Sequence, residues 1–176
     1  MTPKESAVIP PVVRSVVVKA LPDQAFHRFT GQMASWWPLR SHSIGQADAE
    51  TVVMEGKVGG RIVEKIRGGR EAVWGTLTAW DPPRRVAFTW HPGQDPATAQ
   101  DVEVRFSLEG DGTRVELTHS GWERLGAMAR KASRGYSLGW KHVLGLYAGQ
   151  RGAFMVFMGA LMAVMMAVQS KRSKAA

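Results

Sequence analysis

The sequence of 176 residues has no cysteine. Disulfide bonds, thiolate metal sites and cysteine nucleophiles are therefore excluded. Residues 1–13 hold one Lys, one Glu and no long apolar run, so nothing in them is typical of a secretory signal peptide. Together these absences favour a cytoplasmic domain that folds without disulfides.

Several motifs that mark catalytic or metal sites are also missing. There is no HExxH, no histidine pair four residues apart and no acidic cluster with loop spacing, so we expect no bound metal. The glycine pairs in "VGGR" and "RGGRE" lack the context of a phosphate-binding loop, and there is no GxSxG elbow. We therefore expect no cofactor, and no motif supports enzymatic activity.

The positive charge is unevenly distributed. The formal net charge is +8, and half of it belongs to residues 151–176, which hold four basic residues and no acidic one. Elsewhere basic and acidic residues alternate along strand-like segments, as on a solvated face. A nucleic-acid-binding protein more often has a basic stripe interleaved with aromatic residues, so we expect no nucleic-acid partner.

The first 50 residues predict a strand and two short helices. Residues 12–20 are rich in β-branched residues, which indicates a strand. Residues 21–39 have helical spacing, with Gly31 as a break and Pro38 as the end of the second helix. Residues 40–50 are polar and lack periodicity, so we expect a loop there.

From residue 51 apolar and polar residues alternate. Residues 51–90 are divided into about four strands by the pairs Gly59–Gly60, Gly68–Gly69 and Pro82–Pro83. Two further strands, residues 101–109 and 113–119, are apolar on one face only. This pattern is typical of an antiparallel sheet that is covered on one side.

Residues 121–150 return to helical spacing. Apolar residues form one stripe that begins at Trp122 and a second that runs from Tyr136 through Trp140 to Tyr147, and Gly135 between them predicts a break. The simplest packing lays this long helix across the apolar face of the sheet, which gives an α+β fold.

Tryptophan is frequent, with seven in the chain, and three lie in "WGTLTAWDPPRRVAFTW", residues 74–90. Alternation predicts one strand face with Trp74, Thr76, Thr78 and Trp80, and a second with Val86, Phe88 and Trp90. Such faces either fill an ordinary core or line a space where a ligand binds, because a buried indole N–H needs a partner.

Four phrases carry a family resemblance: "VGGRIVEKI", "WGTLTAWDPPRRVAFTW", "DVEVRFSLEGDGTRVELTHSGWE" and "GWKHVL". They resemble the activator of heat-shock protein 90 ATPase homologue-like branch of the SRPBCC, or START-like, superfamily, from about Val12 to Tyr147. The resemblance implies the helix-grip fold, a curved antiparallel sheet wrapped around a long C-terminal helix. It implies an N-terminal extension at residues 1–11, a START-like domain at 12–150 and a further tail at 151–176.

The resemblance also implies a cavity between the sheet and the long helix, without implying a reaction. The residues that it places around this cavity are Trp37 at the mouth, Trp74, Trp90, Tyr136 and Trp140 as walls, and Glu64 and His119 as polar contacts.

Both polar candidates have a second interpretation. Glu64 shares a face with Ile62 and Ile66, where a carboxylate could anchor a ligand or act as an acid, but exposed isoleucine is common and we favour an outward face or a bulge. His119 ends an apolar stripe and could bind a ligand or pass a proton, yet a histidine at a strand end is more often structural. We expect His142 to be exposed.

The tail contains "GAFMVFMGALMAVMMAV", residues 152–168, which has no charged, amide or hydroxyl side chain. As a helix it would span roughly 26 Å against about 30 Å of hydrocarbon. Three interpretations remain: a C-terminal membrane anchor, a Met-rich helix that packs on a second copy or another protein, and a helix at a membrane interface. The first would attach the domain to the inner face of a membrane.

For the function we expect non-catalytic binding of a small hydrophobic molecule in the cavity. The alternatives are a cochaperone-type protein-interaction module with a role in stress response, and, more weakly, a polyketide cyclase or dehydratase-like enzyme that uses Glu64 or His119.

Overall fold

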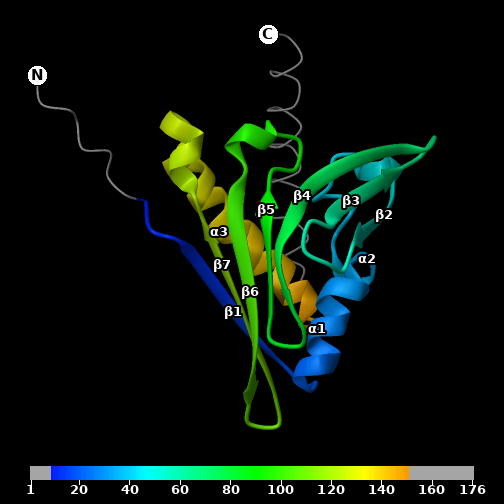
Figure 1. Cartoon of the computed structure of the whole chain (residues 1–176), viewed down its shortest axis with the longest axis vertical. Helices are drawn as coiled ribbons and strands as arrows, with labels where there is room; N and C mark the ends of the chain where they lie inside the picture. Colours follow the sequence, from blue (N-terminus) through cyan, green and yellow to red (C-terminus); the bar gives the residue numbers. More distant parts are fainter. Residues whose placement is uncertain (1–8, 151–176) are drawn as a thin grey trace, which may run out of the picture.

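One antiparallel sheet of seven strands organises the part of the chain that the structure, a computed structural model, describes: residues 9–150 (Figure 1). The spatial order is β1-β7-β6-β5-β4-β3-β2, so β1 and β2 are the two edges. The strands are β1 (Val12–Val18), β2 (Ala49–Met54), β3 (Arg61–Ile66), β4 (Arg70–Asp81), β5 (Arg85–Trp90), β6 (Gln100–Glu109) and β7 (Gly112–Ser120). The helices are α1 (Pro22–Gly31), α2 (Met33–Trp36), α3 (Ala129–Tyr147) and the 3₁₀ segments η1 (Gln46–Asp48), η2 (Pro96–Thr98) and η3 (Trp122–Met128).

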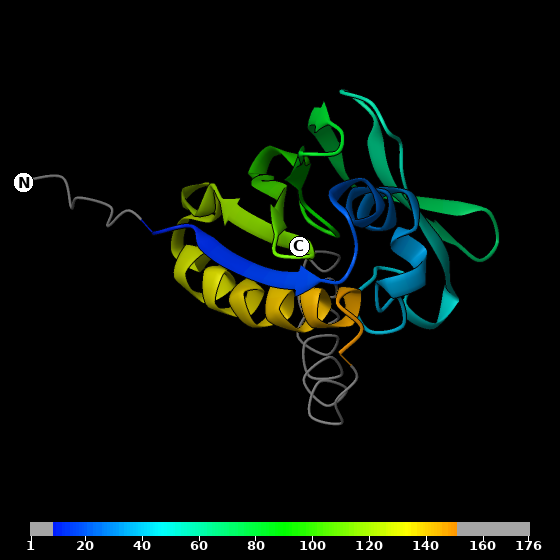
Figure 2. The ribbon, with the colours of Figure 1, turned by 90° about the horizontal axis from the view of Figure 1, so that it is seen from below.

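Helix α3 lies across one face of the curved sheet and runs alongside β1 (Figure 2). Its buried side is built by Trp140, Val143, Leu144 and Tyr147, which recur at helical spacing. Helices α1 and α2 follow β1 in the chain and pack near β2 and β6. This confirms the predicted helix-grip architecture, with two short helices after the first strand and a long C-terminal helix.

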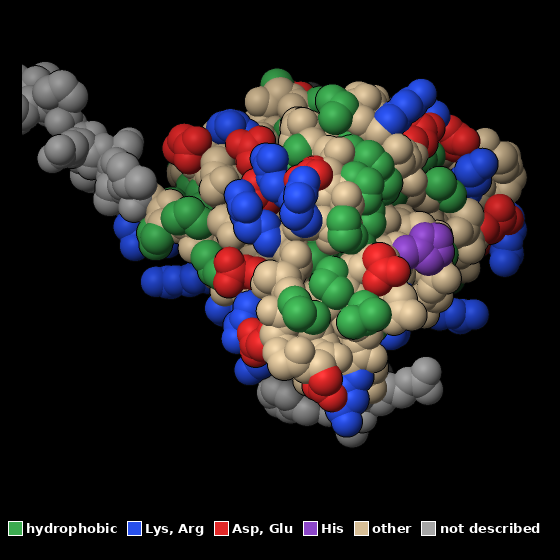
Figure 3. Space-filling model, turned by 60° about the horizontal axis from the view of Figure 1, so that its bottom comes forward, with side chains coloured by type: hydrophobic (Ala, Val, Ile, Leu, Met, Phe, Trp, Pro, Cys, Tyr) green, Lys and Arg blue, Asp and Glu red, His purple; other side chains and the backbone are tan. Residues whose placement is uncertain are grey.

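The predicted one-sided alternation is clear in β7. Val115, Leu117 and His119 are fully buried, whereas the residues between them are partly exposed. On the outer face charged side chains of both signs are interspersed (Figure 3), and Glu103 there accepts hydrogen bonds from Arg85 and Arg105 at 2.6 Å. Solvent therefore covers the outer face of these strands, and the core lies between the inner face and α3.

The strict alternation predicted along β4 is wrong. Trp74 and Leu77 are each 1% exposed, whereas Thr78 is exposed. Two register shifts, one at Trp74 and one just after Leu77, insert β-bulges that move the following side chains to the opposite face. The bulge brings the backbones so close that a Cβ on Gly75 would lie 1.7 Å from the Thr89 carbonyl oxygen. Only glycine fits there.

The break in the C-terminal helical segment also differs from the prediction. Gly135 lies inside the continuous helix α3, and the irregular backbone falls earlier, at Gly126, whose φ of 52° and ψ of −125° introduce a kink within η3. A positive φ is tolerated by glycine because it has no Cβ. The segment that holds Trp122 is thus a kinked 3₁₀ helix that precedes α3.

No helix within residues 9–150 is long and apolar enough to cross a bilayer. The apolar run at residues 152–168 lies outside the described part of the chain, as do residues 1–8 of the predicted N-terminal extension. The anchor, partner-helix and homodimer interpretations of the tail therefore stay predictions.

Candidate functional site

Four tryptophans from four different segments meet beneath α3. Trp37 follows α2, Trp74 lies in β4, Trp90 ends β5 and Trp140 belongs to α3, and none is more than 7% exposed. Five pairs of their ring centroids lie between 5.3 and 5.9 Å apart, in tilted or edge-to-face geometry. Such contacts stabilise aromatic packing beyond the area buried. We refer to these four residues as the tryptophan cluster.

Glu64 is attached to this cluster and is fully buried. Its face of β3 points inward with Ile62 and Ile66, so the favoured prediction of an outward face is wrong. The carboxylate accepts three hydrogen bonds, from the Trp74 indole at 2.9 Å and from the backbone N–H groups of Ile44 at 2.8 Å and Gly45 at 2.7 Å. These bonds hold the loop before β2 against the sheet. We call the Glu64 carboxylate with its three hydrogen bonds the Glu64 clamp.

The same loop packs against the tryptophan cluster. The Trp37 indole donates to the His42 carbonyl at 2.7 Å and its side chain is buried, so its predicted place at the mouth of a cavity stays a prediction. His42 packs against His142 of α3 with ring centroids 5.2 Å apart, and both are 6% exposed. The predicted exposure of His142 is therefore wrong, because the loop folds over it. Burial, and secondarily the charge of His142, lowers the pKa of His42 to about 4.

His119 is held by the tryptophan cluster from the other side. It is fully buried, and its Nδ1 accepts a hydrogen bond from the Trp140 indole at 2.9 Å. Burial lowers the pKa of His119 to about 3, so the ring is neutral near pH 7. Because Nδ1 is the acceptor, the proton of the neutral ring must be on Nε2. His119 is thus a fixed hydrogen-bond donor rather than a proton carrier in the neutral pH range.

Around His119 lies a group of buried polar atoms that have no hydrogen-bond partner within the described residues. We call it the polar nest; its atoms are Trp90 Nε1, Gln100 Oε1, His119 Nε2, Trp122 Nε1 and the Tyr136 hydroxyl. The rings of His119, Trp122 and Tyr136 contact one another, with centroids 4.1 to 5.6 Å apart. Trp90 is paired with Gln100 across β5 and β6.

This concentration of unpartnered atoms is unusual, because buried polar groups are almost always hydrogen-bonded. Two indole N–H groups and one imidazole N–H can only donate, whereas the Gln100 carbonyl oxygen accepts and the Tyr136 hydroxyl does either. Burial raises the pKa of Tyr136 to about 12, and hydrogen bonding from the nearby Trp90 and Gln94 side chains opposes this shift, although neither contact has the distance and angle of a full hydrogen bond in the structure. The nest is therefore rich in donors and suited to oxygen acceptors.

The structure brings all seven predicted site residues into one connected assembly. The tryptophan cluster is its centre, Glu64 is joined through Trp74, and His119 and Tyr136 are joined through Trp140. Sequence reasoning assigned Trp122 to the core and missed Gln100, which sits at the start of β6 after a polar loop. No pattern in the sequence separates Gln100 from its loop neighbours.

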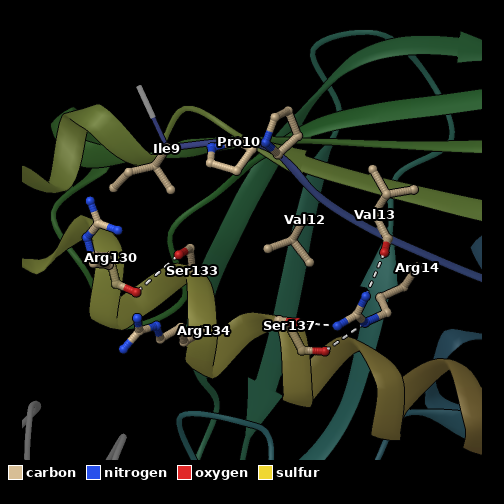
Figure 4. Close-up of a pocket in the computed structure, with 10 residues that line it drawn as sticks. Ile9, Pro10, Val12, Val13, Arg14, Arg130, Ser133, Arg134 and Ser137 are labelled. Atoms are coloured by element: carbon tan, nitrogen blue, oxygen red, sulfur yellow. Dashed lines mark hydrogen bonds between the residues drawn. The ribbon is translucent and has the colours of Figure 1, made fainter. Parts of the chain in front are cut away.

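Of the hollows on the surface, two are well defined, and neither of these is lined by a predicted site residue. One is a groove between β1 and α3 (Figure 4), and the other lies between α1 and the β4–β5 turn, beside Trp80. The tryptophan cluster itself is packed ring against ring. Within residues 9–150 no group of three or more His, Asp or Glu side chains could hold a metal ion.

Comparisons with known proteins agree with this architecture. The family model described as Activator of Hsp90 ATPase homolog 1-like protein matches residues 19–145. No curated protein matches the chain. Among solved structures, the anthrahydroquino-γ-pyrone synthase Txn09 is 34% identical, with a TM-score of 0.52 over 88% of this chain and 97% of the synthase.

Two more distant structures show the fold alone. CalU16 from Micromonospora echinospora is 20% identical with a TM-score of 0.57, and covers 90% of this chain and 86% of its own. The Aha1 dimer from Colwellia psychrerythraea is 14% identical with a TM-score of 0.55, and the match covers 82% of this chain and 100% of the Aha1 chain.

Proposed function

The chain belongs to the Activator of Hsp90 ATPase homolog 1-like family, and on that premise we propose that it binds a small hydrophobic molecule between the sheet and α3. The observation that supports this most is the polar nest, five buried polar atoms without partners beside a cluster of tryptophans. In an ordinary core these atoms would be paired, since each unpaired buried group costs about 1–3 kcal/mol. A ligand that supplied partners would remove that cost.

The surroundings of the nest define what such a ligand looks like. Trp90, Trp122, Tyr136 and Trp140 present ring faces and edges, which favour a flat aromatic body. The donors of the nest favour oxygen substituents. The relative that is 34% identical is named for an anthrahydroquino-γ-pyrone, a fused-ring aromatic that bears oxygen, and this supports the same ligand class for this chain.

Binding requires the packed rings to separate. The segment that covers the tryptophan cluster is attached by the three bonds of Glu64 and by the bond from Trp37 to His42. The nest lies at the opposite end of the site, under η3 and the first turns of α3. A ligand can therefore occupy the nest while the Glu64 clamp stays closed.

The test is a fluorescence titration of the full-length chain with anthraquinone-2-carboxamide, a neutral planar aromatic with carbonyl oxygens. We expect saturable quenching of tryptophan emission at one probe per chain. Tyr136→Phe should weaken binding several-fold because it removes one partner from the nest, whereas Tyr147→Phe should not. Quenching that stays linear with probe concentration, or an equal effect of both variants, would argue against the proposal.

A second candidate function is ring closure of a polyketide-type substrate, and the name of the 34% identical synthase favours it. His119 and Glu64 do not suit a proton-transfer role here, because Nδ1 of His119 and both carboxylate oxygens of Glu64 already accept hydrogen bonds. Catalysis would then depend on the donors of the nest, which could stabilise a developing oxyanion. Turnover that survives His119→Leu, which removes the N–H donor, would count against this candidate.

A further inference from the structure

A groove with a basic rim lies just outside the polar nest. It runs between β1 and α3 and has a volume of about 340 Å³ (Figure 4). Its lining is apolar on the β1 side apart from Arg14, and polar on the α3 side. The residues are Ile9, Pro10, Pro11, Val12, Val13 and Arg14 on one side, and Arg130, Ser133, Arg134 and Ser137 on the other. The lining has no acidic residue.

The arginines of the groove fall into two groups. Arg14 already has hydrogen-bond partners within the fold. It donates to the Ser137 carbonyl at 3.1 Å, to the Ser137 hydroxyl and to the Val13 carbonyl at 2.9 Å. Arg130 and Arg134 lie one turn apart on α3, and neither has a hydrogen bond or an ion pair from its side chain to any residue in 9–150. Two like charges at this spacing repel each other, so an anion placed between them is favoured.

The floor of the groove is the outer wall of the nest. Val12 pairs with His119 across β1 and β7, so their side chains share the inner face of the sheet. Ser133 is buried and lies one helical turn before Tyr136. A single layer of side chains therefore separates the groove from the unpartnered atoms of His119 and Tyr136.

Few hydrogen bonds join β1 to α3 along this wall. β1 is an edge strand, and within residues 9–150 its hydrogen bonds to α3 all come from the Arg14 side chain. The rest of the contact between β1 and α3 is packing of side chains such as Val12. Displacing them requires no backbone ladder to break, unlike an opening between two paired strands.

We propose that this groove is the outer half of the ligand site. The ligand carries an anionic oxygen group, in the simplest case a carboxylate, that pairs with Arg130 and Arg134. Its aromatic body passes Val12 and lies against the polar nest. This inference rests on the proposed function and adds the charge of the ligand and the side from which it is held.

The experiment compares anthraquinone-2-carboxylate with its neutral carboxamide on the full-length chain, by fluorescence titration at low and high salt. The wild type should bind the carboxylate about tenfold more tightly than the carboxamide, and salt should reduce the difference. The double variant Arg130→Gln/Arg134→Gln should remove the preference and leave carboxamide affinity unchanged. Lys131→Gln/Lys141→Gln is the matched control, since both lysines are exposed on α3, neither lines the groove and the pair removes the same charge.

The outcomes separate this inference from the proposed function. Equal affinity of the wild type for the two probes would overturn the inference that the groove binds an anionic group, and so would a double variant that no longer binds either probe. In both cases carboxamide binding to the wild type would still support the proposed function. If the double variant weakens binding of the carboxylate probe but Tyr136→Phe does not, the groove is not continuous with the nest and the inference is wrong. If neither probe binds the wild type, the inference and the proposed function fail together.

Discussion

Replacing Tyr136 by Phe is expected to raise the free energy of unfolding, whereas the same change at Tyr147 is expected to lower it. These are the only two tyrosines of the chain, so they form a matched pair. The Tyr136 hydroxyl is buried without a partner, whereas the Tyr147 hydroxyl donates to the Ala25 carbonyl at 2.7 Å and joins α3 to α1. Both variants remove one oxygen atom and keep the ring.

The expected magnitudes follow from what each hydroxyl does. Burying an unpartnered hydroxyl costs about 1–3 kcal/mol, and part of this is recovered when Phe replaces Tyr136, so we expect a gain of about 1 kcal/mol. At Tyr147 the change breaks a buried hydrogen bond that joins two helices, while the Ala25 carbonyl keeps its bond within α1, so we expect a loss of about 1 kcal/mol. The binding experiment should show the reverse order, with probe affinity reduced only in Tyr136→Phe.

The assay is urea denaturation followed by tryptophan fluorescence, with equal m-values required for comparison. A loss of stability in Tyr136→Phe of the same size as in Tyr147→Phe would show that the Tyr136 hydroxyl is satisfied in the free protein. The polar nest would then be an ordinary paired core, and the argument for a ligand would lose its main support.

Further predictions concern the clamp, the buried histidines and α3. Glu64→Gln should lower the free energy of unfolding by about 2–3 kcal/mol, because an amide cannot accept all three buried hydrogen bonds, whereas Glu71→Gln in the same hairpin should leave the urea midpoint unchanged. Acidification from pH 7 to pH 5 should destabilise the fold, because burial lowers the pKa of His119 to about 3 and that of His42 to about 4. Below about pH 6.5 the unfolded chain binds protons that the folded chain does not. This lowers the free energy of unfolding by up to about 1.4 kcal/mol per pH unit for each histidine. A free energy of unfolding that stays constant between pH 7 and pH 5 would contradict this prediction. Gly135→Ala should raise the thermal midpoint, since a Cβ there meets nothing within 4 Å and alanine favours a helix interior by about 1 kcal/mol; a lower midpoint would show that the helix depends on this glycine.

Much of the fold follows from local patterns in the sequence. The alternation that ends at His119 predicted the inner face of β7, and the glycine and proline pairs predicted the strand boundaries between 51 and 90. The bulges of β4 could not be predicted, because they depend on the approach of Gly75 to the backbone of Thr89, a contact between two strands.

The sequence indicated which residues lie in the candidate site better than it indicated their hydrogen-bond partners. The family resemblance predicted that the strands and the long helix surround one space, and five of the seven residues lie in β4, β5, β7 and α3, whereas Trp37 follows α2 and Glu64 lies in β3. The partners of Glu64 are backbone N–H groups about twenty residues earlier in the chain, and no side-chain pattern marks them. His142 is predicted to be exposed because it lies beside Lys141 on the helix, but the loop that carries His42 packs against it and buries it.

Native mass spectrometry of the full-length chain incubated with anthraquinone-2-carboxamide tests the central claim most directly. The account predicts one additional species, heavier by a single probe, that disappears under denaturing conditions and is weaker in Tyr136→Phe than in Tyr147→Phe. Only the unliganded mass, at probe concentrations where tryptophan emission is already quenched, would contradict a binding site between the sheet and α3.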